Sequence, residues 1–426
     1  MYKLVMCKPQ SKESSPRMNL DRKKLLALIM LLTIPASATD GYFSTGYGIK
    51  QQGWGGAGLA FPQDSLAAAT NPAGMVFVGN RFDFGMTYFR PIRGATITGT
   101  GFADGPYDAS RHKNYFIPEI GYNHLVNPNL SLGVSIYGNG GMNTSYTTPI
   151  PLLGSTRAGV DLEQLFVAPT VAFKANSHNA FGASLNVGWQ RFSAGGLQNF
   201  DNPVASSSPG DVTNRGYNAS YGAGFRVGWL GTISQYLSVG ATYQSRTYMQ
   251  KFDKYKGLFA EQGGFDIPAN FAGGVAVKVH PKATVAFDVE RILYGQVKSI
   301  ANLDSNQAQL GANNGPGFGW HDITAIKTGI NFKASSALTL RGGYNHSGLP
   351  FDATQTFFNL LAPAVVQNHL TAGLTWGLSN GKEINVAYQH AFKKTVNGVN
   401  SIPIPGANAN LHMYQDSVGI SFGWGR

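Results

Sequence analysis

The sequence predicts an all-β transmembrane fold, a 14-stranded antiparallel outer-membrane β-barrel with an N-terminal plug (hatch) in its lumen. Three observations predict it: an export signal at the start, period-two alternation over most of the chain, and a glycine-rich segment between the two. The composition agrees. Only 13% of the 426 residues are charged, whereas 54 are glycine and 12% are aromatic. This balance is typical of strands with one apolar face and one polar or small face.

Residues 1–38 have the pattern of a secretory signal peptide. Three basic residues (22–24) precede the apolar run 25–34, and an Ala-x-Ala cleavage site ends at residue 38. The run is too short for a transmembrane helix, which needs roughly 20 residues. Met18 is a more ordinary start for such a peptide than Met1, and residues 1–17 would then be a misassigned upstream extension. We expect the mature chain to begin at Thr39.

Removing this leader changes the charge and the cysteine count. The leader holds seven Lys/Arg and two Asp/Glu, so the formal charge falls from +11 to about +6. The remaining basic residues form no cluster, which argues against a nucleic-acid partner because phosphate binding needs grouped Lys and Arg. The only cysteine, Cys7, lies in the leader. A cysteine-free mature chain suits an oxidising compartment.

From about residue 80 onward, apolar residues alternate with polar or small ones, as in 417–424, which indicates strands. Fourteen such runs are predicted near 81–90, 115–125, 129–139, 160–174, 178–191, 216–231, 236–250, 266–279, 282–296, 321–334, 336–346, 366–379, 381–394 and 411–424. Tight turns alternate with long polar connections, which lie at 92–114, 140–159, 193–215, 297–320 and 347–365. This alternation is typical of outer-membrane barrels. A secreted β-sandwich or solenoid is the alternative, but its strands usually have about five or six residues.

Residues 39–80 do not alternate and are rich in glycine. Asp64 or Ser65 can cap a short helix through Ala69, and Pro72 ends it because the residue before a proline is disfavoured in the α region. A compact segment ahead of a wide barrel lies either outside it or inside it. A 14-stranded barrel is wide enough to be a channel or to hold a plug. We therefore predict a hatch over 39–80 and a barrel over 81–426.

Several sequence blocks resemble one family of transporters. They include PQDSLAAATNPAGM (62–75), RFDFGMTYFRP (81–91), SLNVGWQRFSAGGLQNF (184–200) and NHLTAGLTW (368–376). These blocks are similar to the FadL/TodX family, outer-membrane transporters of long-chain fatty acids and hydrophobic compounds, and they follow the family's order over the mature chain. The resemblance implies a transporter of hydrophobic molecules, and the absence of a P-loop in the sequence predicts that its transport is passive. Substrate binds apolar sites at the outer side, the hatch rearranges, and substrate leaves sideways through a kinked third strand.

The resemblance also assigns residues to roles. Asn71, Pro72 and Ala73 match the hatch motif, for which a local helix stop is the alternative. Glycines of the third strand would form the lateral opening, with an ordinary glycine-rich loop start as the alternative: Gly138, Gly140 and Gly141. The candidate ligand-binding residues are Phe43, Tyr47, Trp54, Leu59 and Phe61 in the hatch and Phe351, Phe357, Phe358, Leu360 and Leu361 in a long loop. For both groups, packing within the hatch or within the loop is the alternative.

A basic side chain near the pocket could pair with a fatty acid carboxylate. Four candidates remain equal at this point: Arg157, Lys174, Arg191 and Lys327. The nine histidines show no HExxH or other metal-ligand spacing, and no P-loop is present. We expect neither enzyme activity, cofactor nor metal. A Ser-His-Asn hydrolase built on His321 is the enzyme alternative, and it lacks a nucleophile motif.

The expected partners follow from the barrel prediction. They are a hydrophobic small molecule, outer-membrane lipids and lipopolysaccharide, and the barrel-assembly machinery, whose C-terminal signal residues 417–424 resemble. A monomer is expected. Two other functions remain as alternatives: a general porin, and a surface barrel whose loops act as adhesin or phage receptor. Whether the substrate is a fatty acid, an aromatic hydrocarbon or an alkane is not decided by the sequence.

Overall fold

The computed structural model describes residues 40–425. The predicted signal peptide, residues 1–38, lies outside them. Within the described residues, no helix is long and apolar enough to cross a membrane.

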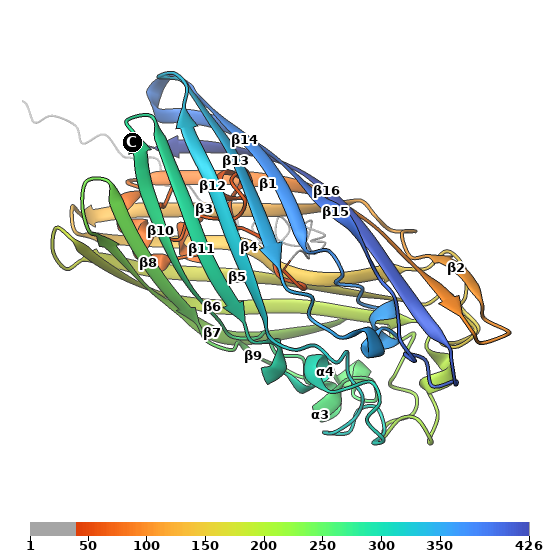
Figure 1. The fold of residues 1–426 in the computed structure, drawn as a ribbon. Coiled ribbons are helices and arrows are strands. Elements are labelled where there is room, and N and C mark those ends of the chain that lie inside the picture. The colour runs from red at the N-terminus through yellow and green to blue at the C-terminus, as the bar shows by residue number, and fades with distance from the viewer. Residues whose placement is uncertain (1–39, 426) are drawn as a thin grey trace, which may run out of the picture. The chain divides into compact units, whose positions relative to one another are not determined.

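Fourteen long strands form a closed antiparallel sheet, as predicted (Figure 1). They are β1 Arg81–Thr98, β3 Tyr115–Asn127, β4 Leu130–Ser145, β5 Gly159–Lys174, β6 Asn179–Gly195, β7 Asn218–Thr232, β8 Leu237–Gln244, β10 Asn270–His280, β11 Ala283–Ile292, β12 Ile323–Lys333, β13 Leu338–Ser347, β14 Asn368–Gly377, β15 Lys382–Val396 and β16 Asn408–Gly425. Two short strands, β2 Gly105–Asp108 and β9 Tyr248–Met249, are added at the edges of β1 and β7. Pairing of β1 with β16 closes the barrel, from Arg81 opposite Gly425 to Thr98 opposite Asn408.

Two connections were predicted too long. The ranges 92–114 and 140–159 were expected to be loops, but β1 continues to Thr98 and β4 to Ser145. The extension of β1 is stabilised by continuous pairing with β16, and that of β4 by pairing with β5. Backbone pairing with a long neighbour holds these glycine- and threonine-containing ends in strands, where the alternation of their side chains is weaker.

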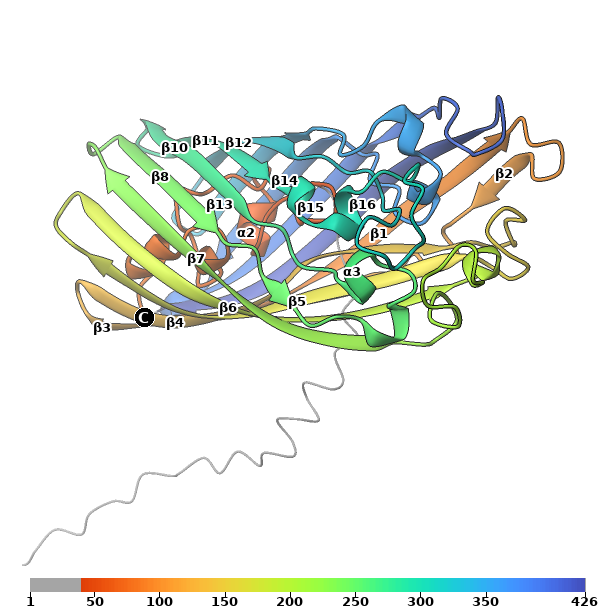
Figure 2. The ribbon, with the colours of Figure 1, turned by 90° about the horizontal axis from the view of Figure 1, so that it is seen from below.

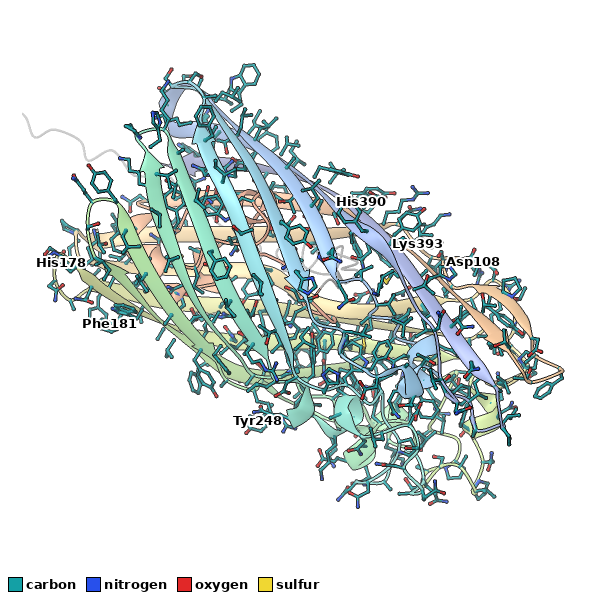
Figure 3. The ribbon with its side chains drawn as sticks, viewed as in Figure 1. Asp108, His178, Phe181, Tyr248, His390 and Lys393 are labelled. Carbon is teal, nitrogen blue, oxygen red and sulfur yellow. The ribbon has the colours of Figure 1, made fainter. Side chains whose placement is uncertain are left out.

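Short turns lie at one end of the barrel and long loops at the other. Figure 3 labels His178 at the turn end and Tyr248 toward the loop end. The loops contain two short helices, α3 Ala260–Gly263 and α4 Lys298–Ala301, and the 3₁₀ turns η3 Gln198–Phe200, η4 Asp253–Tyr255, η5 Tyr294–Gln296, η6 Ala353–Gln355 and η7 Phe358–Leu360. One further 3₁₀ turn, η8 Ser379–Gly381, lies at the turn end.

The barrel wall presents apolar side chains outward. In β6, burial alternates along the strand, with Phe181 and Leu185 on the exposed face and Ala180 and Ser184 on the buried face. Phe181 points away from the barrel in Figure 3. Because successive strand residues point to opposite faces, one apolar band can face lipid while polar and small residues face the lumen.

The hatch lies inside the barrel (Figure 2). It contains α2 Ile49–Gln52 and two 3₁₀ helices, η1 Ala67–Ala69 and η2 Pro72–Phe77. The predicted helix through Ala69 is therefore only a 3₁₀ turn, although Asp64 does accept a hydrogen bond from the Leu66 amide at 3.0 Å. The helical turn ends before Asn71, as expected, and Asn71 itself is extended. Pro72 begins η2 because proline suits the first helical position.

Candidate functional site: hatch, wall break and cavities

Glycines of the barrel wall let the hatch backbone approach closely. A Cβ atom added at Gly182, Gly343 or Gly140 would lie under 3.0 Å from hatch backbone atoms, a separation that real Cβ atoms do not reach. Gly182 faces the Pro72-Ala73 peptide, Gly343 faces Trp54 and Gly140 faces Tyr42. The three glycines belong to β6, β13 and β4, respectively. The hatch backbone therefore approaches the wall closely on more than one side of the barrel.

Three acidic side chains of the wall accept hydrogen bonds from hatch turns. Glu119 on β3 accepts from the amides of Gly48 and Ile49 at 3.1 and 2.9 Å. Asp288 on β11 accepts from Gly58 and Leu59 at 2.8 and 2.9 Å. Asp83 on β1 accepts from the Ser65 amide at 3.0 Å and from its hydroxyl at 2.5 Å. Backbone amides of irregular segments need partners when buried, and these carboxylates provide them.

The Asn-Pro-Ala motif contacts both the hatch and the wall. The side-chain amide of Asn71 donates to Trp229 O on β7 at 2.9 Å and to Leu59 O at 3.0 Å. Its oxygen accepts from the Ala73 amide at 3.1 Å, which caps η2. Pro72 and Ala73 pack against Gly182 on β6. The motif thus forms a turn cap and a wall contact at once.

Ion pairs also connect hatch and wall. Lys50 pairs with Glu383 on β15 at 2.5 Å, and Glu383 also contacts Arg81. Asp40 pairs with Lys327 on β12 at 3.3 Å, and Lys327 pairs with Glu290 at 2.7 Å. Lys327 is therefore already neutralised by two acids.

The other three basic candidates are also accounted for. Arg191 forms a two-bond ion pair with Glu163, both bonds 2.8 Å long. Arg157 is exposed and donates to Thr147 O. Lys174 lies over the Phe77 ring, 4.8 Å from its centroid. The structure brings none of these three to the cavities described below.

The third barrel strand, β4, is partly unpaired on one side. Its pairing with β3 ends at Glu119 opposite Tyr137, so residues 138–145 have no partner in β3; Ser145 forms an isolated bridge with Ser110 in the loop before β3. The register shifts between Gly138 and Gly140, which marks a bulge. The wall therefore has a break in its ladder between residues 115–118 of β3 and 138–145 of β4, at the three predicted glycines.

The start of the hatch lies against this break. Tyr42 O accepts from the Gly141 amide at 2.9 Å, and the Ser44 amide donates to Asn139 O at 3.3 Å. Phe43 forms an isolated β-bridge with Gly140. The hatch thus satisfies backbone groups of β4 that β3 leaves unpaired. It does so from the lumen side.

Two cavities lie among the long loops. One has a volume of about 570 Å³ and lies between four loops, with Phe357 and Phe358 in its lining. The other, about 40 Å³, is almost wholly apolar and contains Phe358 and Leu361. The two share lining residues at Phe358 and Leu310. Of the predicted loop residues, Phe351 stacks on Trp320 instead, and Leu360 accepts a hydrogen bond from Tyr146 through its carbonyl.

The predicted hatch residues lie deeper and are packed more tightly. Phe43 contacts Tyr42 and Tyr294 in the main apolar cluster. Trp54 stacks on Phe61 with ring centroids 5.4 Å apart. Tyr47 and Leu59 line a cavity of about 20 Å³ that also contains charged side chains. Trp54 and Phe61 therefore pack on each other, whereas Tyr47 and Leu59 reach a small space lined in part by charged side chains.

A further cavity, of about 30 Å³, contains a residue that the sequence analysis missed. Arg93 lines it together with Met142 and Asn143 of the unpaired part of β4. Period-two alternation continued beyond residue 90 would have found it, because positions 89, 91 and 93 are all buried. The inner loop cavity likewise contains Phe192, Phe259 and Phe318, which no sequence pattern singled out.

His321 lies in an exposed loop 4.0 Å from Asp352, and His369 is buried beside Asn345. In the part of the chain that the structure describes, no group of three or more His, Cys, Asp or Glu is placed to hold a metal ion.

Comparison with known proteins gives a consistent result. The model of the outer membrane protein transport protein family (OMPP1/FadL/TodX) matches residues 36–423. The toluene transporter TodX of P. putida has a similar structure, with TM-score 0.69 and 19% identity over 90% of this chain and 99% of that chain. A Pseudomonas aeruginosa FadL homologue gives TM-score 0.69 at 14% identity, over 90% and 99% of the two chains.

The Ralstonia pickettii toluene transporter TbuX gives TM-score 0.64 at 17% identity, over 89% of this chain and 98% of that chain. A search of curated protein sequences gave no match. At such low identities the structural likeness shows the fold, whereas the family model covers residues 36–423 of the 426. The chain is therefore an outer-membrane β-barrel that belongs to the FadL/TodX family.

Proposed function

We propose that this protein takes up hydrophobic small molecules, long-chain fatty acids or aromatic hydrocarbons, passively across the outer membrane. Substrate enters the apolar cavities among the loops, the hatch rearranges, and substrate leaves through the break between β3 and β4. The proposal is supported by membership of a transport family and by likeness to two toluene transporters.

The observation that carries the lateral route is the break in the wall. Residues 138–145 of β4 lack a partner in β3, and the hatch residues Tyr42 and Ser44 occupy two of the freed backbone groups. Moving these hatch residues would leave a gap in the barrel wall without breaking any β3–β4 hydrogen bond. An opening between two strands that pair along their whole length would have to break a ladder of antiparallel hydrogen bonds.

An apolar cargo favours such a route. Leaving apolar surroundings for a water-filled pore would cost roughly 0.8 kcal/mol per CH₂ group. Apolar loop cavities followed by lateral delivery into the bilayer avoid most of that cost. Phe192, Phe259 and Phe318 provide the aromatic lining of the inner loop cavity.

A cross-link that holds the hatch in place tests the proposal. Thr45 in the hatch donates to Gln389 on β15 at 3.0 Å, so the double variant T45C/Q389C can be joined by a short bifunctional thiol reagent. The only native cysteine, Cys7, lies in the predicted leader. We expect uptake of labelled oleate and toluene to fall at least tenfold on cross-linking. Each single-cysteine variant treated with the same reagent is the control.

Unchanged uptake in the cross-linked protein would contradict hatch movement. A steady, high ion conductance of the wild-type protein in planar bilayers would instead favour a general porin. Loop deletions that abolish attachment of a phage or a host cell while uptake persists would favour the surface-receptor alternative.

A further inference from the structure

Arg93 differs from the other buried basic residues of the described chain. Its side chain is only 1% exposed, yet it forms no salt bridge within residues 40–425. Two other buried arginines without salt bridges bond to the hatch: Arg226 donates to Thr70 O at 3.1 Å and Arg341 to Gln63 at 3.0 Å. Arg93 bonds only to the wall and to the loop that follows β2.

The partners of the Arg93 guanidinium are all neutral. Nη1 donates to Pro91 O at 3.0 Å, and Nη2 to His112 O at 3.0 Å and Tyr115 Oη at 3.2 Å. Nη2 also donates to the Asn143 side-chain oxygen. Nη2 has two hydrogens, so three acceptors share them. The Nε hydrogen has no partner among the described residues.

A buried cation without an acidic partner is unfavourable, because neutral acceptors compensate only part of the lost hydration. The cavity that Arg93 lines contains no carboxylate. The cavity that Arg226 lines contains both Asp288 and Glu290. An anion in the Arg93 cavity would therefore meet a positive charge that no residue within 40–425 neutralises by direct contact.

The shape of this cavity fits the head of an amphipathic acid. Its volume of about 30 Å³ corresponds to about two water positions, which is the number of oxygens in a carboxylate. The remaining lining is mostly apolar and includes Met142, Trp320 and Met413. Phe318 and Leu361 line the inner loop cavity. Trp320, two residues after Phe318, and Ala362, directly after Leu361, line the Arg93 cavity. The same two chain segments thus contribute to the lining of both spaces.

We propose that Arg93 binds the carboxylate of a hydrophobic acid and that this contact selects acids over neutral molecules of the same chain length. The inference rests on the proposed transport function and deepens it. A carboxylate forms stronger, charge-assisted hydrogen bonds than the amide oxygen of Asn143, so it displaces Asn143 from Nη2. Asn143 belongs to the part of β4 that has no β3 partner. Cargo binding therefore removes a bond that holds β4 to β1 beside the wall break.

Matched ligands and matched variants test this assignment. The full-length mature protein in nanodiscs is titrated with labelled dodecanoate and with labelled methyl dodecanoate, which has the same chain but no charge. The test variants are Arg93→Gln and Asn143→Asp. The second keeps Arg93 but gives it a carboxylate partner of its own. Arg157→Gln, at an exposed arginine outside the cavities, is the control.

We expect Arg93→Gln and Asn143→Asp each to weaken dodecanoate binding about tenfold or more, the usual effect of losing a charge-assisted hydrogen bond. Methyl dodecanoate binding should stay within about twofold, and Arg157→Gln should change neither. If Arg93→Gln does not fold, Asn143→Asp decides the question. Equal effects on both ligands, or no effect on either, would overturn the assignment while leaving the transport function intact. Binding of neither ligand to the wild type would overturn both.

Discussion

Asn71 joins the hatch to the barrel through a hydrogen bond from its side-chain amide to Trp229 O, 2.9 Å long. The same side chain bonds to Leu59 O and to the Ala73 amide. One residue thus fixes the fold of the hatch turn and its contact with β7. Because Asn71 is 2% exposed, water cannot replace these bonds without movement of the hatch.

Replacing Asn71 with alanine should loosen the hatch. The change leaves two buried carbonyls and one amide without this partner, and each lost bond costs about 1–3 kcal/mol when water cannot compensate. We expect more frequent current spikes in planar-bilayer recordings than in the wild type. Asn129→Ala, in an exposed turn, is the control. Recordings that match the wild type would mean that Asn71 is only a turn cap.

Gly182→Ala should disturb the hatch without disturbing the strand. A Cβ at this position would lie under 3.0 Å from backbone atoms of Pro72 and Ala73, which cannot move alone. We expect faster hydrogen exchange of the amides in residues 71–77. Gly273→Ala is a matched control on β10, because a Cβ there meets nothing within 4 Å. Equal exchange in the two variants would contradict a steric role for the wall glycines.

The sequence was sufficient for the barrel but not for its contacts. Alternation and turn residues located all fourteen strands, because a wall with a lipid face and a lumen face imposes period two on every strand. The far end of β1 was missed, since residues 91–98 are held by pairing with β16 and their side chains carry a weaker signal. The sequence of residues 91–98 does not show that β16, more than 300 residues further along the chain, pairs with them.

The roles of the candidate site residues remain predictions. The Asn71 motif and the third-strand glycines were found through family resemblance, and the structure places both at hatch–wall contacts. The basic candidates could not be ranked, because the partners that occupy them lie far apart in sequence, as Asp40 does from Lys327. Arg93 lies at an inward position that alternation predicts, yet only the folded loops create the cavity beside it.

Asp288→Ala should weaken a different part of the hatch. Its Oδ2 atom accepts from the Gly58 and Leu59 amides, so alanine leaves two buried donors unpaired at a cost of about 1–3 kcal/mol each. We expect these two amides to exchange faster, with a smaller change in Asp288→Asn, which keeps an acceptor oxygen. Asp253→Ala in a long loop is the control. Unchanged exchange at residues 58 and 59 would exclude Asp288 as a hatch contact.

The hatch should be bound less tightly inside the barrel as pH rises from about 4 to about 6. Burial raises the pKa of Asp64 from 3.8 to about 6, the nearby Asp83 adds to the shift, and Lys50 and Arg81 oppose it. Between these two values the docked hatch keeps a proton that the released, hydrated carboxyl would lose. Releasing the hatch therefore releases a proton, so release becomes easier as pH rises through this window and remains easier above it.

Planar-bilayer recordings at pH 4 and pH 7 measure this effect. The wild type should show more frequent current spikes at pH 7, and Asp64→Asn should reduce the difference because its amide cannot ionise. Some pH dependence should remain, since burial also raises the pKa of Asp40 to about 6 in the same hatch. The amide oxygen of asparagine still accepts from Leu66, so the turn at residue 64 keeps its hydrogen bond. A pH dependence as large in Asp64→Asn as in the wild type would show that another group controls the hatch.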